Sequence, residues 1–215
     1  MLTTISKNGG MLAAFAIVTT ALISLTYNGT RATIEEKKQA RLLGVLTEVV
    51  PTTYFDSPLY RHCTVVSDPL LGNSASHRVY LAVKNNEVQA FAVEATAPDG
   101  YSGNIALIVG VSKTMDVLGV RVLDHKETPG LGDKIELAVS DWITGFTGRQ
   151  FDPDNLIPWQ VKKDGGDFDQ FTGATITPRA VVGAVKNALL FVSDNKNSLT
   201  QADNACSINP GASNE

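Results

Sequence analysis

Three threonines lie within six positions of the chain, at Thr172, Thr175 and Thr177, and a long apolar-periodic run follows them. Thr177 and Pro178 are typical of a helix start, because threonine caps a helix and proline favours its first position. A helix start presents free backbone N–H groups and the positive end of the helix dipole, which together bind phosphate. The pattern predicts a phosphate site at Thr175, whose hydroxyl would lie beside the bound group.

The residues between these threonines also favour a ligand. Gly173 and Ala174 have little or no side chain, so a bulky group can approach the backbone there. The alternative is that Thr172, Thr175 and Thr177 serve only as turn and cap residues of the last helix. Composition and spacing alone leave both interpretations open.

Two Gly-rich stretches upstream are candidate ligand-binding loops. In TPGLG, residues 128–132, a proline and two glycines build a loop with little side-chain bulk around Leu131. In YSG, residues 101–103, an aromatic ring and a hydroxyl stand in a tight turn. Each stretch by itself is equally an ordinary connection. The candidate binding residues here are Thr128, Gly130, Leu131, Gly132, Tyr101 and Ser102.

Charged residues near these motifs carry weaker assignments. Lys162 precedes the threonine cluster and is a candidate for balancing a negatively charged ligand, although a lysine on a solvated strand end is commoner. His125 and Glu127 suggest acid–base chemistry, but a lone His-x-Glu carries little information. We interpret both as residues that shape the loop.

The elements that must position these motifs indicate an α+β domain with a mainly antiparallel sheet and packed helices. Two β-rich runs flank Asn85-Asn86, a plausible hairpin turn within residues 77–97. Residues 105–112 and 117–127 form a second pair, joined through KTMD. The supply of Val, Ile and Ala in four neighbouring runs favours antiparallel pairing.

Helical patterns surround these strands. Residues 33–50 read as an amphipathic helix with a capping box at Thr33 and Glu36, residues 133–146 as a short helix, and the last helix runs from Thr177-Pro178 to about Val192. Residues 51–72 are turn-rich and are expected on the surface, and the polar tail after the last helix is expected to be loose. The apolar face of the first helix comprises Ile34, Leu42, Leu46 and Val49.

One uncharged segment, Gly9–Tyr27, predicts a transmembrane anchor, because about 19 residues at 1.5 Å each span roughly 29 Å. The alternative is a cleaved signal peptide, which the lack of a convincing small-x-small site disfavours. Lys7 precedes the span and Arg31, Lys37, Lys38 and Arg41 follow it. This charge count does not decide the orientation, since acidic residues are interleaved with the later charges.

Composition restricts the partners and the inorganic chemistry. A net charge of −4 with 19% charged residues gives no sign of a nucleic-acid footprint. The two cysteines, Cys63 and Cys206, either form one disulfide closing most of the domain or remain two thiols. Without a CxxC pair, we expect no zinc or iron–sulfur site.

A family resemblance extends these observations. D-x-x-T-G-A-T at residues 169–175 resembles the flavinylation motif of the FMN-binding domain family, and residues 99–110 and 123–135 resemble its other signature segments. Their order and spacing are similar to those of the RnfG family, which belongs to the Rnf (Rsx) ion-translocating electron-transport complexes, over nearly the whole chain. A related protein of the sodium-pumping NADH:quinone oxidoreductase shares the domain but is usually longer.

The resemblance implies a function and a location. Covalent FMN would be esterified through its phosphate to Thr175 by a periplasmic flavin transferase, with Thr172, Gly173, Ala174 and Thr177 around it. The TPGLG loop would lie flat against the flavin ring, with Leu131 packing on its face. The chain would be a relay subunit in the bacterial inner membrane, working with the other subunits of a complex between ferredoxin and NAD, with its soluble domain in the periplasm. No substrate chemistry of its own is expected. The alternative is a membrane-anchored, non-redox periplasmic binding or assembly module.

The sequence thus divides into four parts. Residues 1–30 hold a short cytoplasmic N-terminus and the anchor in the bilayer, and residues 31–97 hold the amphipathic helix and the first strands. Residues 98–194 form the FMN-binding core, and residues 195–215 form the polar tail.

Overall fold

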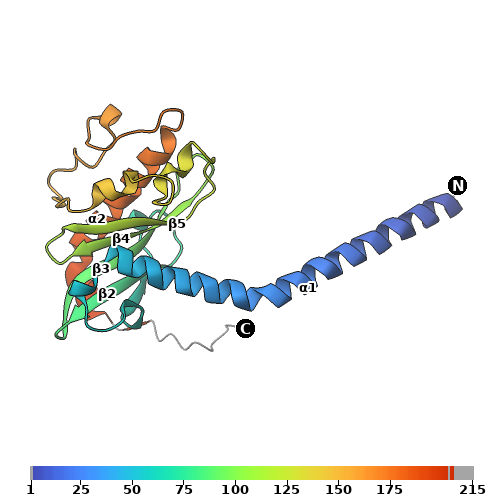
Figure 1. Cartoon of the computed structure of the whole chain (residues 1–215), viewed down its shortest axis with the longest axis horizontal. Coiled ribbons are helices and arrows are strands. Elements are labelled where there is room, and N and C mark those ends of the chain that lie inside the picture. Colours follow the sequence, from blue (N-terminus) through green and yellow to red (C-terminus); the bar gives the residue numbers. More distant parts are fainter. Residues whose placement is uncertain (1, 203, 206–215) are drawn as a thin grey trace. The chain divides into compact units, whose positions relative to one another are not determined.

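The computed structural model describes residues 2–202, 204 and 205, and the chain separates into two compact units, residues 1–43 and 44–215. Helix α1 (Leu2–Val49) forms the first unit and supplies the first turns of the second (Figure 1). Its stretch Lys7–Arg31 has a mean hydropathy of 1.8 and is long and apolar enough to cross a membrane. Helix α2 (Ile176–Gln201) passes the same test but is more than half buried, as expected of a core helix.

The prediction of a separate amphipathic helix beginning at Thr33 is wrong. Thr33 lies inside the continuous helix α1, so its neighbours already have helical hydrogen-bond partners and a capping box is not needed. Of the predicted apolar face, Leu46 and Val49 are buried in the core, whereas Ile34 is exposed. Only the last turns of α1 therefore belong to the packed domain.

A five-stranded antiparallel sheet is the centre of the second unit, with strands in the order of the sequence. The strands are β1 (Cys63–Val66), β2 (His77–Lys84), β3 (Glu87–Ala97), β4 (Ile105–Ser112) and β5 (Val117–Asp124). Asn85 and Asn86, both with positive φ, form the predicted hairpin turn between β2 and β3. The α+β class and the antiparallel sheet are thereby confirmed.

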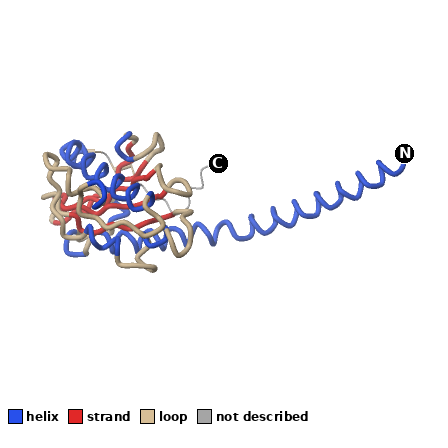
Figure 2. Tube along the Cα trace, turned by 90° about the horizontal axis from the view of Figure 1, so that it is seen from above, coloured by secondary structure: helices blue, strands red, loops and turns tan. Residues whose placement is uncertain are grey.

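Helices cover both faces of this sheet, as the trace in Figure 2 shows for the end of α1 and for α2. On one face the backbone of α1 comes so close to Gly110 and Gly119 that a Cβ on Gly110 would lie 1.9 Å from the Val49 carbonyl oxygen. On the other face Val181, Val185 and Leu189 of α2 pack in the main core, which also includes Phe91 and Val109 of the sheet. The strands are consequently packed between the end of α1 and α2.

Three segments differ from the prediction. Residues 51–72, predicted as surface turns, include β1 as well as short 3-10 turns at Thr52–Tyr54, Leu59–Arg61 and Pro69–Leu71. Residues 133–146 form two 3-10 turns, Gly132–Ile135 and Trp142–Phe146, in place of one helix, and Lys162–Asp164 form another. Helix α2 continues to Gln201, so the first part of the predicted loose tail is helical, with Leu199 buried.

The end of the described chain is attached to the first strand. Asn204 Oδ1 accepts a hydrogen bond from the Cys63 backbone N–H at 3.2 Å, and the Ala205 N–H donates to the Cys63 carbonyl at 2.9 Å. Cys63 is disulfide-bonded, so the alternative of an unpaired thiol is wrong for this residue. Cys206 lies outside the described residues.

Candidate functional site

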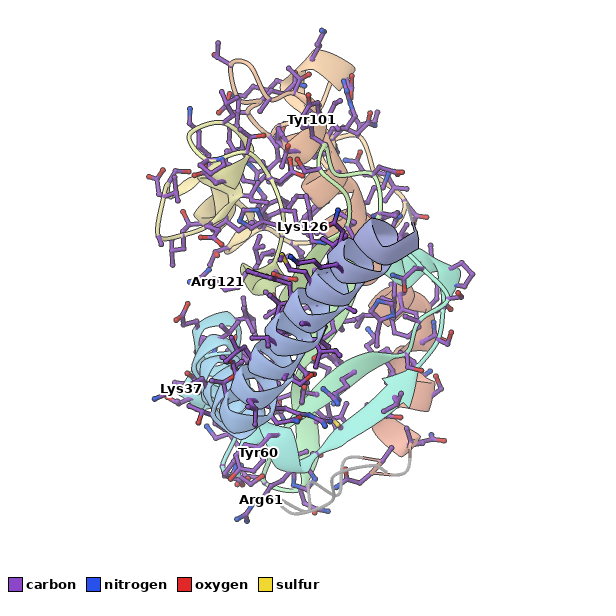
Figure 3. All side chains as sticks on the ribbon, turned by 90° about the vertical axis from the view of Figure 1, so that its right-hand side faces the viewer. Lys37, Tyr60, Arg61, Tyr101, Arg121 and Lys126 are labelled. Carbon is purple, nitrogen blue, oxygen red and sulfur yellow. The ribbon has the colours of Figure 1, made fainter. Side chains whose placement is uncertain are left out.

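A cavity of about 360 Å³ lies at the start of α2, where three segments far apart in sequence meet. Tyr101 at its edge lies at the opposite end of the second unit from Tyr60 and Arg61 (Figure 3). The volume of the cavity falls within the range of small-molecule sites. The lining residues are Tyr101, Glu127, Thr128, Leu131, Gly132, Gly173, Ala174, Thr175, Ile176 and Thr177.

The threonine motif enters the cavity through a tight turn. The Ala174 N–H donates to the Phe171 carbonyl at 3.2 Å, and Gly173 between them has a φ of +84°. This is a turn with glycine at the third position, as a type II turn requires. The turn brings the chain to Thr175, the residue that immediately precedes α2.

The helix start differs in detail from the prediction. Helix α2 begins at Ile176, so Thr175 occupies the cap position, and its side chain makes no capping hydrogen bond. Thr177, predicted as the cap, lies in the first helical turn, where it is fully buried and donates its hydroxyl hydrogen to Glu127 Oε2. Thr175 is exposed. The hydroxyl of Thr175 is therefore accessible, and that of Thr177 is not.

The TPGLG stretch forms the facing wall. The Leu131 N–H donates to the Thr128 carbonyl at 3.1 Å, across a turn in which Pro129 is second and Gly130 is third with a φ of +78°. Leu131 itself is 41% exposed, and its Cδ2 atom would lie 3.3 Å from a Cβ placed on Gly173. The two turns thus meet across the cavity through this leucine.

Buried at the base of the cavity, Glu127 is 5% exposed. Its Oε1 atom accepts a hydrogen bond from the Ser102 N–H at 2.8 Å, and its Oε2 atom accepts from Thr177. His125 Nδ1 accepts from the Glu127 N–H at 3.0 Å, and the other ring nitrogen of His125 lies 3.0 Å from Glu136 Oε1. The two residues do shape the loop, but Glu127 also joins it to both other segments.

Aromatic side chains pack against the first residues of the threonine motif and the residues just before it. Trp142 Nε1 donates to the Asp169 carbonyl at 2.9 Å, and its ring meets Phe171 edge to face with centroids 5.1 Å apart. Phe146 stacks on Phe168 at 4.2 Å. Sequence reasoning missed this support because Trp142 is 27 residues from its partner. The clustering of aromatic residues between 142 and 171 was the available signal.

Eight of the twelve candidate residues line the cavity, and four do not. Ser102 contributes its backbone N–H to Glu127, and Gly130 shapes the turn before Leu131. Thr172 is exposed at the second position of the turn around Gly173, and Lys162 Nζ pairs with Asp169 Oδ1 at 2.6 Å on the surface. Within the described residues, no group of three or more His, Cys, Asp or Glu side chains is arranged to hold a metal ion.

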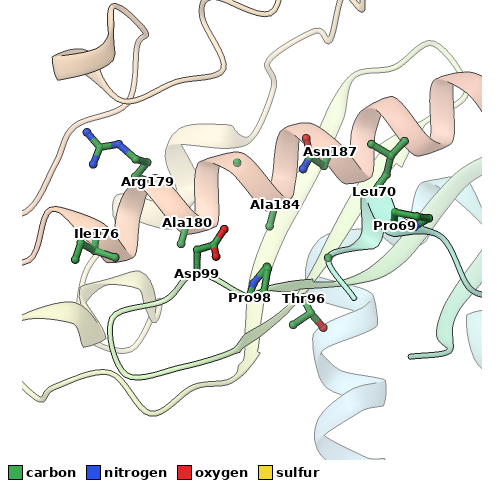
Figure 4. A pocket seen from close by; sticks show the side chains of 12 residues that line it. Pro69, Leu70, Thr96, Pro98, Asp99, Ile176, Arg179, Ala180, Ala184 and Asn187 are labelled. Carbon is green, nitrogen blue, oxygen red and sulfur yellow. The ribbon is translucent and has the colours of Figure 1, made fainter. Parts of the chain in front are cut away.

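A second cavity, of about 340 Å³, shares only Ile176 with the first (Figure 4). It lies between α2 and the segments around Leu70 and Pro98, and helix residues with small side chains, such as Ala180 and Gly183, form one wall. Arg179 at its edge is bonded to Asp164 at 2.6 and 2.9 Å, and this interaction lowers the pKa of Asp164. None of the candidate hydroxyls of residues 172–177 lines this cavity.

Two family models match this chain, one at its N-terminal helix and one at the domain that contains the first cavity. Residues 100–190 match the FMN-binding domain family, and residues 1–49 match the RnfG N-terminal region. A relative from Vibrio cholerae serotype O1, named as the G subunit of an ion-translocating oxidoreductase complex, is 52% identical over 206 residues, covering 96% of this chain and 99% of the relative.

Two further relatives carry the same name. The protein from Pseudoalteromonas atlantica is 53% identical over 203 residues, covering 94% of each chain. The protein from Yersinia pestis is 51% identical over 192 residues, covering 89% of this chain and 92% of the relative. All ten lining residues of the first cavity fall inside the segment that matches the FMN-binding domain.

Proposed function

Since the chain belongs to the RnfG family of ion-translocating oxidoreductase complexes and contains an FMN-binding domain, we propose that it is an electron-transfer protein with FMN joined to Thr175 by a phosphoester. The single observation that carries the residue assignment is the state of three hydroxyls. Thr175 lines the cavity with an exposed side chain that makes no capping bond, Thr177 is buried and bonded, and Thr172 lies outside the lining.

The residues present fit a flavin phosphate. The first turn of α2 has backbone N–H groups without helical acceptors and the positive end of the helix dipole, both of which favour a phosphate next to Thr175. Gly173 and Ala174 leave the backbone approachable. Leu131 and Tyr101 offer exposed apolar surface on which a flat ring can pack.

The attachment is a phosphoryl-type transfer to a hydroxyl. The Thr175 Oγ1 atom forms a bond to the phosphorus of an FMN group that is activated as a pyrophosphate in the donor. With FAD as donor, the bond from that phosphorus to the bridging oxygen would break, AMP would leave with that oxygen, and the hydroxyl proton would pass to the transferase or to solvent. No electrons are exchanged in this step.

Once attached, FMN supplies electron transfer, and the chain supplies its surroundings. Because the phosphoester does not alter the ring system, the protein acts on the redox potential only through packing and hydrogen bonds. Leu131 would pack on the ring and exclude water from it, and Glu127 joins the walls of the cavity through its two hydrogen bonds. A tethered flavin also stays in place through both redox states.

We also propose a membrane location, an orientation and partners for this protein, on the basis of its family. The stretch Lys7–Arg31 anchors the chain in the bacterial inner membrane as a single pass, and the FMN domain faces the periplasm, where a flavin transferase acts. The partners are the other proteins of the complex, which couples electron flow between ferredoxin and NAD to ion movement. The family membership supports this assignment.

Expression of the membrane form with its flavin transferase tests the proposal. Wild-type protein on a denaturing gel is expected to retain flavin fluorescence, Thr175→Val to lose it without losing the fold, and Thr172→Ser to keep it. Thr147→Val is the matched control, because it removes an exposed hydroxyl outside both the cavity lining and the threonine motif. Fluorescence retained in Thr175→Val moves the attachment site, and a colourless wild-type protein favours a non-redox binding or assembly module.

A further inference from the structure

We propose that Glu127 is a positioning residue for the attachment of FMN, because its carboxylate joins the three segments that present Thr175. The inference rests on the proposed function of Thr175. Through these contacts the chain would direct the transferase to one threonine out of three.

Glu127 bonds to one segment on each side of its own loop. Ser102, 25 residues earlier, donates its backbone N–H to Oε1 at 2.8 Å, and Thr177, 50 residues later, donates its hydroxyl to Oε2. The partners thus come from the turn before β4 and from the first turn of α2. Removal of the carboxylate leaves the Ser102 N–H and the Thr177 hydroxyl without their hydrogen-bond acceptor.

The carboxylate and the threonine that donates to it are both buried. Glu127 is 5% exposed and Thr177 is fully buried. A Cβ on Gly132 would lie 2.8 Å from Oε2 and 3.0 Å from the Thr177 hydroxyl oxygen, so the glycine backbone lies directly against this pair. Water therefore has little room to replace the hydrogen bond between Glu127 and Thr177.

Burial of this carboxylate without a cation needs an explanation. Among the ion pairs of the described residues, none involves Glu127. A buried carboxyl group is costly unless hydrogen bonds and nearby dipoles compensate it, and the start of α2 contributes a favourable dipole. An apolar residue of similar size would fill this position without the cost of burying a carboxyl group. The role that remains for the carboxylate is to fix the positions of Ser102 and Thr177 through its two hydrogen bonds.

That geometry distinguishes the threonines. The bond to Glu127 holds the Thr177 hydroxyl inside the domain as a donor, which removes it as a competing acceptor of FMN. It also fixes the first turn of α2, directly after Thr175. Thr175 is thereby left with an accessible hydroxyl on a firmly held backbone. A displaced hydroxyl reacts much more slowly, since a shift of about 1 Å can reduce a rate about a hundredfold.

Flavin transfer to the purified, flavin-free full-length chain in detergent tests the proposal, with FAD as donor and purified flavin transferase. For Glu127→Ala and Thr177→Val we expect kcat to fall by about tenfold or more, with KM for the chain nearly unchanged. In Glu127→Gln the amide oxygen can accept from the Ser102 N–H while the amide nitrogen donates to the Thr177 hydroxyl oxygen, and Thr177→Ser keeps its hydroxyl, so both variants should stay within about threefold of wild type. In the double variant Glu127→Ala/Thr177→Val, kcat should be no lower than in the poorer single variant, because both substitutions remove one linkage.

Asp164→Asn is the matched control. It removes the charge of Asp164 and one of its two hydrogen bonds with Arg179, a residue of α2 that follows Thr177 by two positions and does not line the first cavity, and it should leave kcat unchanged. Circular dichroism at the assay temperature checks that each variant is folded. Thr177→Val keeps the shape of its side chain, so it provides the test if Glu127→Ala does not fold.

A second readout needs no flavin. Hydrogen exchange of the Ser102 amide in the flavin-free chain should be faster in Glu127→Ala by about tenfold or more, because its acceptor is lost. Unchanged exchange, or a folded Glu127→Ala chain flavinylated at the wild-type rate, overturns the positioning role while leaving Thr175 as the attachment site. A wild-type chain that takes up no flavin overturns the proposed function instead, and the exchange measurement still decides the linkage.

Discussion

Leu131→Ala removes the side chain that connects the TPGLG turn to the turn around Gly173. In the structure Leu131 lines the cavity and is 41% exposed, in a loop whose backbone is fixed by the Thr128 carbonyl. We expect the flavin ring to cover the remaining exposed part. The variant therefore separates the packing of the ring from the attachment of its phosphate.

The magnitude follows from the exposure. Full burial of a leucine side chain contributes about 1.5–3 kcal/mol relative to exposure. Because 41% is still exposed in the chain alone, a covering ring adds about 1 kcal/mol. If that contribution differs fully between the oxidised and reduced flavin, the midpoint potential shifts by about 20 mV for a two-electron couple, which is an upper limit.

The assay compares flavin-loaded wild type, Leu131→Ala and a matched control, Leu137→Ala. Leu137 is also 41% exposed but does not line the cavity. We expect equal flavin content in all three proteins, since the threonine motif is intact. Only Leu131→Ala should show stronger quenching of flavin fluorescence by iodide and a shifted midpoint potential in spectroelectrochemical titration. If Leu131→Ala and Leu137→Ala behave alike in both measurements, the TPGLG loop does not pack on the ring and is only a turn.

Three further predictions concern the turn, the compartment and the surface. Gly173→Ala should lower the free energy of unfolding by about 1–2 kcal/mol, because Gly173 has a left-handed φ of +84° and the added Cβ would contact Leu131. Gly148→Ala is its control: Gly148 has a φ of +79° but open space around it, so only the cost of the backbone conformation should appear. A chain without residues 1–30 should fold but stay flavin-free in the cytoplasm and gain FMN when an export signal is added, by in-gel fluorescence; full loading in a cytoplasm lacking a transferase contradicts the periplasmic assignment. Arg179 lowers the pKa of Asp164, so this pair stabilises the fold above the usual aspartate pKa and loses its effect as pH falls through the lowered value. Urea unfolding of Asp164→Asn should accordingly differ from wild type at neutral pH and not in acid, and a difference that grows in acid contradicts this sign.

The sheet could be predicted because its signals are local. In β2 to β5 the β-branched residues recur within single segments, and Asn85-Asn86 suits a turn with positive φ at both positions. Strand β1 has only four residues and lies between 3-10 turns, so no periodic pattern marks it. Its pairing with β2 is a long-range contact that single-segment patterns do not contain.

The helix ends were harder to predict for the same reason. Residues 133–146 have helix-like spacing, but the bond from Trp142 to the Asp169 carbonyl and the contact of its ring with Phe171 favour a turn that brings them together. Helix α2 extends into a polar sequence because Leu199 is still buried in the core. Tertiary packing decides both boundaries over local preference.

The candidate site was predictable as far as residue types reveal a motif. The turn glycines Gly130 and Gly173 and the threonine cluster were visible in the sequence, and the structure brings their segments to one cavity. The connecting role of Glu127 was not visible, because its partners lie 25 and 50 residues away. The interpretation of Thr177 as a cap was wrong for that reason, since the bond to Glu127 competes with capping.

Peptide mapping by mass spectrometry tests the central claim most directly. Full-length protein from membranes that contain the flavin transferase is denatured, digested and fragmented, so that flavin-bearing peptides are located to single residues. The account predicts that the peptide containing residues 172–177 carries the mass of FMN less one water, with fragment ions placing it on Thr175. In the Thr175→Val protein, the same peptide should carry no flavin mass. Flavin on Thr172, on Thr177 or on any other segment, or no covalent flavin at all, would contradict it.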